Sequence, residues 1–216
     1  MTDQRAARAS IVAAGARLGS RGLIVATEGN LSIRLGSAIL ITPAGRRKDE
    51  LAPDDVVEVD LDGPSDGLEP PDGTGRQPST DLAIHRAIYR ARPDVAAIAH
   101  AHIAASLSLT TAGLVPDPAD LPEAALLLPR LPYVPFATAG SAALAAAVAG
   151  AFTDRGSAGD EAPAGAVLLE RHGSIAVGPD LVVAGDRLEL VDLLCRVRLD
   201  VALLRGAPRD GTPDDH

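Results

Sequence analysis

The sequence predicts a single α/β domain, and three observations support this. A chain of 216 residues has the usual length of one domain with a sizeable core. Segments of helical periodicity alternate with short apolar segments typical of strands. The one long stretch rich in Gly, Pro, Asp and Ser, residues 63–78, is followed by a helix and a strand of similar composition. We therefore interpret it as a surface loop and not as a linker between domains.

The N-terminal part predicts one helix followed by strands. Residues 4–18 have a helical pattern, and Gly19 and Gly22 end it. Short apolar or alternating segments then predict strands, with a hairpin at Gly36-Ser37. These segments are residues 23–25, 31–34, 38–42 and 56–61.

The next helix is expected to begin at Ser79-Thr80-Asp81, because a hydroxyl caps free N–H groups and an acid suits the helix dipole. Pro93 ends it. Further helices are predicted at residues 104–111, 141–152 and 183–204, with Ser141 as a cap. Further strands are predicted at residues 95–102, 166–169 and 174–177, and short apolar pieces at 124–128 and 133–136. Residues 207–216 form an acidic tail that we expect to be disordered, which leaves residues 1–206 as the domain.

Composition excludes several classes of partner. The formal net charge is −9, and the chain has no Trp, two Phe and two Tyr, which argues against nucleic acid. No apolar run is long enough to span a bilayer, and the N-terminus lacks the apolar core of a signal peptide. The single cysteine, Cys195, cannot form a disulfide within the chain and falls in a predicted helix, where it is expected to be inert. We therefore expect a cytoplasmic protein.

The run from Val95 to His102 carries the strongest chemical signal. It is small and apolar, as in a buried strand, and it ends in His100-Ala101-His102. Strand side chains alternate faces, so His100 and His102 point the same way and supply half of a zinc site. A third histidine, His172, stands between an apolar run and a turn. Three histidines and one open position are typical of catalytic zinc, whereas the alternative is a set of unrelated structural histidines.

Asp81 has two interpretations. It is either a carboxylate beside the metal that acts as a general base, or an ordinary acid at a helix start. His85, four residues later, could bind metal with it, but its apolar neighbours favour a place in the core or next to the site. Three segments could bind an anion if they converge, although each alone is an ordinary turn sequence. They are residues 27–32, 42–45 and 79–80.

Taken together, these residues resemble the class II aldolase/adducin family over residues 7–206. The segments that carry the resemblance keep the family's order and spacing. They are Gly22-Leu23, Gly29-Asn30-Leu31-Ser32, Thr42-Pro43-Ala44-Gly45, Ser79-Thr80-Asp81 with His85, residues 89–94, His100-Ala101-His102, residues 138–141 and His172-Gly173.

The resemblance implies a three-layer α/β/α domain around a central, mainly antiparallel sheet, and a homotetramer with active sites at subunit interfaces. It implies one zinc ion per chain, bound by His100, His102 and His172. Asp81 occupies the position of the family's catalytic glutamate. The positions that hold the substrate phosphate are Gly29, Asn30, Gly45, Ser79 and Thr80.

The activity implied is cleavage of a ketose 1-phosphate to dihydroxyacetone phosphate and an aldehyde, through an enediolate that zinc stabilises. An epimerase or a dehydratase on the same scaffold is the first alternative, and a non-catalytic adducin-like protein is the second. Three features depart from the family pattern. Asp81 is one methylene shorter than Glu, Ala44 and Glu28 alter the phosphate loop, and no tyrosine follows Tyr133 to serve as the late proton donor.

Overall fold

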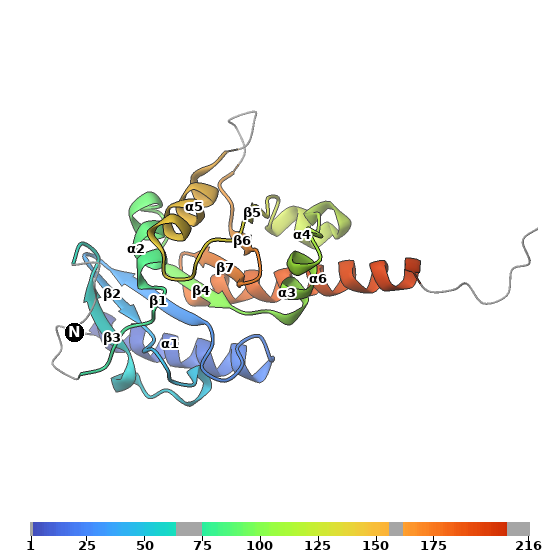
Figure 1. Ribbon diagram of the computed structural model, residues 1–216. Helices are drawn as coiled ribbons and strands as arrows, with labels where there is room; N and C mark the ends of the chain where they lie inside the picture. The colour runs from blue at the N-terminus through green and yellow to red at the C-terminus, as the bar shows by residue number, and fades with distance from the viewer. Residues whose placement is uncertain (1, 64–74, 156–161, 207–216) are drawn as a thin grey trace, which may run out of the picture.

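A seven-stranded sheet crosses the computed structural model, which describes residues 2–63, 75–155 and 162–206 (Figure 1). The strand order is β3-β2-β1-β4-β7-β6-β5. All pairs are antiparallel except β5 and β6. The strands are β1 (Asn30–Leu35), β2 (Ala38–Ile41), β3 (Val57–Asp60), β4 (Ala97–Ala101), β5 (Tyr133–Val134), β6 (Ala166–Leu169) and β7 (Gly173–Gly178).

Helices cover both faces of this sheet, which gives the three layers that the sequence predicts. The α-helices are α1 (Thr2–Ser20), α2 (Leu82–Ala91), α3 (Ala104–Thr111), α4 (Pro122–Leu127), α5 (Ala142–Thr153) and α6 (Leu181–Gly206). Short 3-10 helices are η1 (Lys48–Glu50), η2 (Pro53–Asp55) and η3 (Pro118–Asp120). No helix of the described ranges combines the length and the apolarity needed to cross a membrane.

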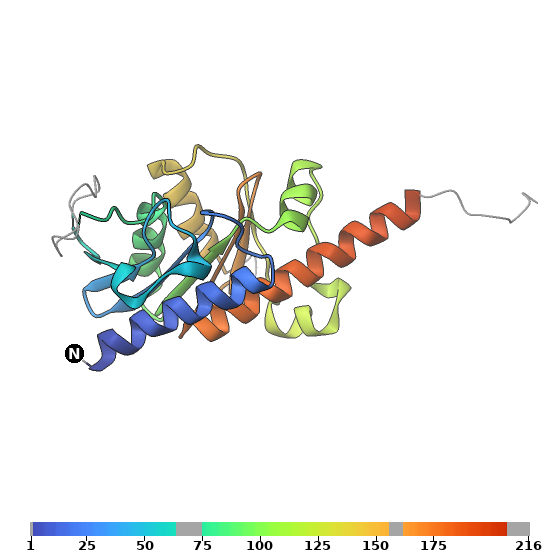
Figure 2. The same cartoon turned by 90° about the horizontal axis from the view of Figure 1, so that it is seen from below.

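The two faces of the sheet have separate apolar cores. Helices α1 and α6 run side by side on one face, and α6 extends beyond the sheet (Figure 2). Helices α2 and α5 pack together on the other face. Within β4, Ala97, Ala99 and Ala101 belong to the α1–α6 core, whereas Ile98 belongs to the α2–α5 core. This alternation places His100 on the α2 side of the sheet.

Strand pairing sets the neighbours of His100. Asn30 on β1 is the register partner of His100, and Ser32 is the partner of Ile98. On the other side of β4, Ile175 of β7 is the partner of His100. Because side chains at paired positions share a face, Asn30, Ser32 and His100 all project toward α2.

Most predicted elements are confirmed, including the helix capped by Ser141, whose hydroxyl accepts a hydrogen bond from the Leu144 amide at 3.1 Å. The strand predicted at residues 23–25 is wrong. The amides of Leu23 and Ile24 bond to the carbonyl of Leu18 and so close the end of α1. The tail predicted at residues 207–216 lies outside the described residues.

Candidate metal centre

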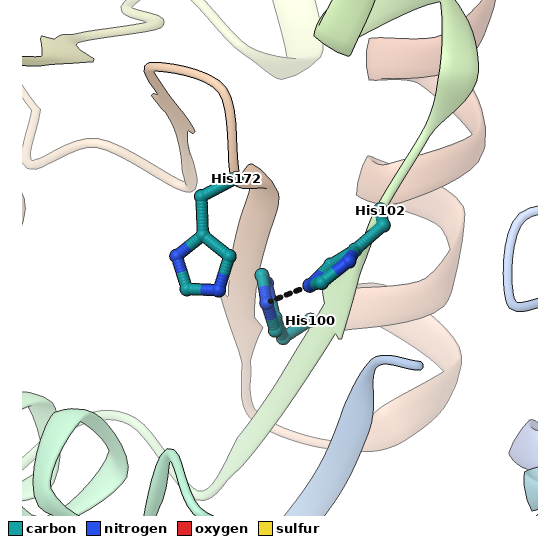
Figure 3. A group of neighbouring side chains, drawn as sticks. All are labelled: His100, His102 and His172. Carbon is teal, nitrogen blue, oxygen red and sulfur yellow. Dashed lines mark hydrogen bonds between the residues drawn. The ribbon is translucent and has the colours of Figure 1, made fainter. Parts of the chain in front are cut away.

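The structure brings His100, His102 and His172 together (Figure 3). His100 lies on β4, His102 follows β4 directly, and His172 lies in the turn between β6 and β7. One ring nitrogen of each lies within 4.8 Å of the others, and the ring centroids are 4.9 to 5.1 Å apart. His100 is fully buried, and the other two rings are partly exposed. The three side chains therefore form one open-sided cluster.

Hydrogen bonds fix which nitrogens face the centre of the cluster. Nδ1 of His100 lies 3.0 Å from the Ser174 carbonyl oxygen, which can only accept, so this nitrogen carries the proton. Nδ1 of His102 faces the Glu28 carboxylate at 3.6 Å. Burial lowers the pKa of His100 to about 3, so the ring is neutral at pH 7. The Nε2 of His100 therefore presents a lone pair inward, and a proton on Nδ1 of His102, toward Glu28, would free the Nε2 of His102 in the same way.

This arrangement fits a metal ion. The Nε2 atoms of His100 and His102 lie 3.1 Å apart, at hydrogen-bond distance (Figure 3). Two nitrogens bound to one tetrahedral zinc at about 2.0–2.1 Å are themselves about 3.3 Å apart. Nδ1 of His172 is the one buried side-chain nitrogen or oxygen that finds no hydrogen-bond partner among the described residues. The histidines could therefore hold a metal ion.

Two glycines allow the backbone to approach the cluster closely. A Cβ at Gly29 would lie 2.6 Å from the His100 carbonyl oxygen, and one at Gly173 would lie 2.4 Å from the Ala101 carbonyl oxygen. Both have positive φ angles, +68° and +128°. Glycine therefore lets the backbone before β1 and at the start of β7 lie directly against the end of β4.

Asp81 lies beside the cluster and immediately before α2. Its Oδ2 is 3.7 Å from Nε2 of His100 and accepts a hydrogen bond of 2.8 Å from Nδ2 of Asn30. Asp81 is the N-cap residue of α2, but within the described residues its carboxylate forms no cap bond with that helix and bonds to Asn30 instead. Burial favours a higher pKa for Asp81, but His100 and the Asn30 hydrogen bond outweigh burial and lower it. A carboxylate is therefore held next to the candidate metal position.

His85 is not part of the histidine cluster. It is fully buried on α2, with Nε2 2.5 Å from Oδ1 of Asn30 and Nδ1 2.6 Å from Oγ of Ser32. Burial lowers the pKa of His85 to about 4. The sequence-based preference for a position in the core or next to the site agrees with this placement.

The three predicted anion-binding segments converge around Thr42. Its hydroxyl accepts from the Leu31 amide at 3.2 Å, and its carbonyl accepts from the Ser79 amide at 3.1 Å. The Ala44 amide also donates to the carbonyl of Gln77. Several backbone N–H groups that could have bound an anion are thus already used within the protein.

Other N–H groups remain available at the same place. Among the described residues, no hydrogen bond engages the backbone N–H of Gly29, Gly45 or Thr80. The hydroxyl of Ser79 accepts from the Asp81 amide at 3.3 Å, and Thr80 is exposed. The side-chain amide of Asn30 already forms two hydrogen bonds, from its nitrogen to Asp81 and at its oxygen with His85. Asn30 therefore differs from the other predicted phosphate residues.

Two charged residues near the site were not among the predicted site residues. Lys48 is only 2 % exposed, its Nζ donates to the Thr27 carbonyl, and burial lowers its pKa. Its place within Arg46-Arg47-Lys48 is typical of a solvated charge run, so the sequence carries no signal of its burial. Glu28 is the carboxylate that faces His102. Only its position beside Gly29-Asn30 could have indicated this.

None of the other reactive groups in the described ranges is an obvious proton donor. The Tyr89 hydroxyl is buried against Ser32 at 2.8 Å, and burial raises its pKa. Tyr133 interacts with Glu170, and its pKa is also raised, first by burial. Cys195 is buried, and burial raises its pKa to about 12, so it is not a nucleophile.

Fold and site together define a class of protein, and comparison with known families agrees. Residues 9–199 match the family described as Class II Aldolase and Adducin N-terminal domain. The chain belongs to this family.

Relatives extend over most of the chain. It is 30 % identical over 185 residues to an L-fuculose phosphate aldolase of Methanocaldococcus jannaschii, covering 85 % of this chain and 90 % of the relative. It is 32 % identical over 196 residues to a 5-deoxy-D-ribulose 1-phosphate aldolase of Bacillus thuringiensis, covering 88 % and 83 %. The crystal structure of L-fuculose-1-phosphate aldolase from Thermus thermophilus is similar with a TM-score of 0.78 and 29 % identity, covering 94 % and 97 %.

A different activity occurs among shorter matches. A methylthioribulose-1-phosphate dehydratase of Methylococcus capsulatus is 39 % identical over 110 residues, half of each chain. The family therefore joins carbon–carbon lyases with at least one dehydratase.

Proposed function

We propose that this protein is a zinc-dependent aldolase that cleaves a ketose 1-phosphate to dihydroxyacetone phosphate and an aldehyde. One observation carries the proposal. Asp81 Oδ2 lies 3.7 Å from the inward-facing Nε2 of His100, so a base and a three-histidine metal site share one small region. The relatives that cover most of the chain are named as aldolases of sugar phosphates.

The proposed residues have two roles, metal binding and proton transfer. His100, His102 and His172 would hold the zinc, which when bound acts as a Lewis acid on the substrate carbonyl and on the negative charge that develops at its oxygen. In cleavage, the C3–C4 bond breaks, the C4 hydroxyl releases its proton to solvent as the aldehyde forms, and C3 takes up one proton. Asp81, an ionised carboxylate at pH 7, would take up a proton from solvent and deliver it to C3, and in condensation it would remove that proton from C3.

The anion side of the site supports a phosphate. The unengaged N–H groups of Gly29, Gly45 and Thr80 and the hydroxyls of Ser79 and Thr80 would hold its oxygens. Lys48 adds a buried positive charge near the segment that contains Gly29. We assign the side chain of Asn30 to positioning Asp81 as well as to the phosphate side, because its Nδ2 already donates to that carboxylate.

A substrate screen tests the proposal. Ketose 1-phosphates of five and six carbons are incubated with zinc-loaded protein, and dihydroxyacetone phosphate is detected with a coupled dehydrogenase. We expect dihydroxyacetone phosphate from at least one of them, and metal analysis should find about one zinc per chain. Loss of water without carbon–carbon cleavage would favour the dehydratase, and inversion at C4 the epimerase. Absence of bound metal after reconstitution would contradict all three.

We further propose a homotetramer in the cytoplasm, with a small sugar phosphate as ligand. The resemblance to the aldolases supports the assembly, and so do the exposed apolar residues near the end of α6, where Leu203 and Leu204 are 63 % and 73 % exposed. Sedimentation of the purified protein tests the assembly. A monomer at micromolar concentration would contradict it.

A further inference from the structure

A chain of buried polar side chains runs from Asp81 into the α2 side of the sheet. Asn30 Nδ2 lies 2.8 Å from Asp81 Oδ2, and Asn30 Oδ1 lies 2.5 Å from His85 Nε2. His85 Nδ1 lies 2.6 Å from Ser32 Oγ, which lies 2.8 Å from the Tyr89 hydroxyl. From Asn30 inward, every member is 3 % exposed or less. Four consecutive hydrogen bonds between buried side chains form one connected unit.

The direction of every hydrogen bond in this chain follows from its outer end. A carboxylate only accepts, so the Asn30 amide turns its nitrogen to Asp81 and its oxygen to His85. That oxygen also only accepts, so His85 carries its proton on Nε2 and accepts at Nδ1. Ser32 must then donate to His85, and Tyr89 must donate to Ser32. All four donors point toward Asp81.

The residues of this hydrogen-bonded chain come from two elements of the fold, β1 and α2. Asn30 and Ser32 project from β1, whereas His85 and Tyr89 lie one turn apart on α2. The Tyr89 ring is also held by Arg34, whose guanidinium lies 5.5 Å from the ring centroid. A rotation of the Asn30 amide would place oxygen against the Asp81 carboxylate and nitrogen against the Nε2–H of His85. The inner members of the chain oppose that rotation.

We propose that Ser32, His85 and Tyr89 are positioning residues that act through Asn30 to hold one carboxylate oxygen of Asp81, leaving the other for the substrate carbon. The catalytic part rests on the proposed function, whereas the proton arrangement does not. Aspartate has one methylene fewer than the glutamate of the family pattern, so its carboxylate depends more on an external partner for its position. That partner is Asn30, which the buried hydrogen-bonded side chains hold in place from the interior of the protein.

The proton arrangement is tested by nitrogen NMR of the zinc-free protein with labelled histidine. We expect His85 to be neutral at pH 7.5 with its proton on Nε2, and this proton to exchange slowly with solvent. The spectrum of His85→Gln assigns the signal. A proton on Nδ1, or a doubly protonated ring, would overturn the proposal whether or not the protein is active.

The positioning role is tested by deuterium exchange at the hydroxymethyl carbon of dihydroxyacetone phosphate, which isolates the step assigned to Asp81. Ser32→Ala removes the central link and should lower kcat for exchange at least about tenfold. Tyr89→Phe removes only the terminal donor and should lower kcat about threefold, because its effect passes through three further hydrogen bonds. KM for dihydroxyacetone phosphate and the zinc content should not change. Ser32→Thr, which keeps the hydroxyl, should restore most of the rate.

Tyr133→Phe is the matched control. It removes a tyrosine hydroxyl on β5, at the edge of the sheet away from β1, and should leave kcat unchanged. Melting temperatures of all variants show whether each is folded at the assay temperature. If the wild-type protein exchanges deuterium and Ser32→Ala and Tyr89→Phe match Tyr133→Phe, the positioning role is wrong and the proposed function stands. If the wild-type protein exchanges none, the aldolase proposal fails, and the NMR result still decides the proton arrangement.

Discussion

The two faces of β4 carry opposite chemistry within five residues. Toward α1 and α6 the strand presents only Ala97, Ala99 and Ala101, packed in an apolar core. Toward α2 it presents Ile98 and then His100, which meets Asp81 and two other histidines. The apolar face needs only suitable volume, whereas the polar face needs a partner for nearly every nitrogen and oxygen. Changes on the first face should therefore alter stability, and changes on the second should alter chemistry.

The largest effect is expected from His100→Ala, because this residue lies next to His102, His172 and Asp81. Zinc content should fall from about one per chain to near zero, and kcat/KM should fall at least about 1,000-fold with the Lewis acid lost. Elemental analysis and the cleavage assay measure both. Circular dichroism at the assay temperature serves as the control for folding. Full zinc content in this variant would exclude His100 as a ligand.

Asp81→Asn separates the proposed base from the proposed metal site on the same face. The amide has the same shape as the carboxylate but cannot take up a proton, so kcat should fall by about 100-fold or more. Zinc content should stay at the wild-type value, because the three histidines are intact. Cleavage at the wild-type rate would remove Asp81 as the base.

Leu188→Ala tests the apolar face. Leu188 is fully buried on α6, and its truncation leaves a cavity that should lower the free energy of unfolding by about 2–5 kcal/mol. Zinc content and kcat, measured well below the melting temperature, should match the wild type. Urea denaturation gives the stability. A selective loss of kcat in folded Leu188→Ala would show that the two faces are not independent.

A smaller effect is expected from pH, through His85. Its pKa is about 4 in the folded protein and near 6.5 when unfolded, so between these values the unfolded chain binds the extra proton. The contribution of His85 to the free energy of unfolding is therefore fully present above pH 6.5 and is lost as the pH falls toward 4. His85 should account for about 2 kcal/mol of the loss between pH 7 and pH 5 in zinc-free protein. Over the same pH range, the free energy of unfolding of His85→Gln should fall by about 2 kcal/mol less than that of the wild type. An identical pH dependence in the two proteins would contradict the low pKa of His85.

Sequence patterns predicted the parts of the molecule that depend on local rules. The helix stop before Pro93, the Ser141 cap and the alternation that aligns His100 with His102 all follow from short-range geometry. The strand predicted at residues 23–25 failed for a physical reason. Leu23 and Ile24 are buried, as strand residues would be, but their amides bond to the end of α1. An apolar run of this length indicates burial and does not specify the hydrogen-bond partner.

Long-range pairing determines the parts that sequence patterns did not predict. The partners of Asn30 are Asp81 and His85, on a different element, and nothing local to Asn30 indicates them. Lys48 and Glu28 likewise become part of the surroundings of the site only through tertiary contacts. Ser32 offered one weak signal, since it stands two residues from Asn30 on the same strand face.

The pairing of β4 with β7 also bears on folding and on metal supply. His100 and His102 stand at the end of one strand, and His172 directly precedes the other, so the three rings meet only after a long loop has closed. The unfolded chain offers an ion two neighbouring imidazoles at most. An ion bound by all three would therefore stabilise only the folded protein, by an amount that grows with free metal concentration. Chelation would then lower the unfolding temperature of a protein whose two apolar cores are unchanged.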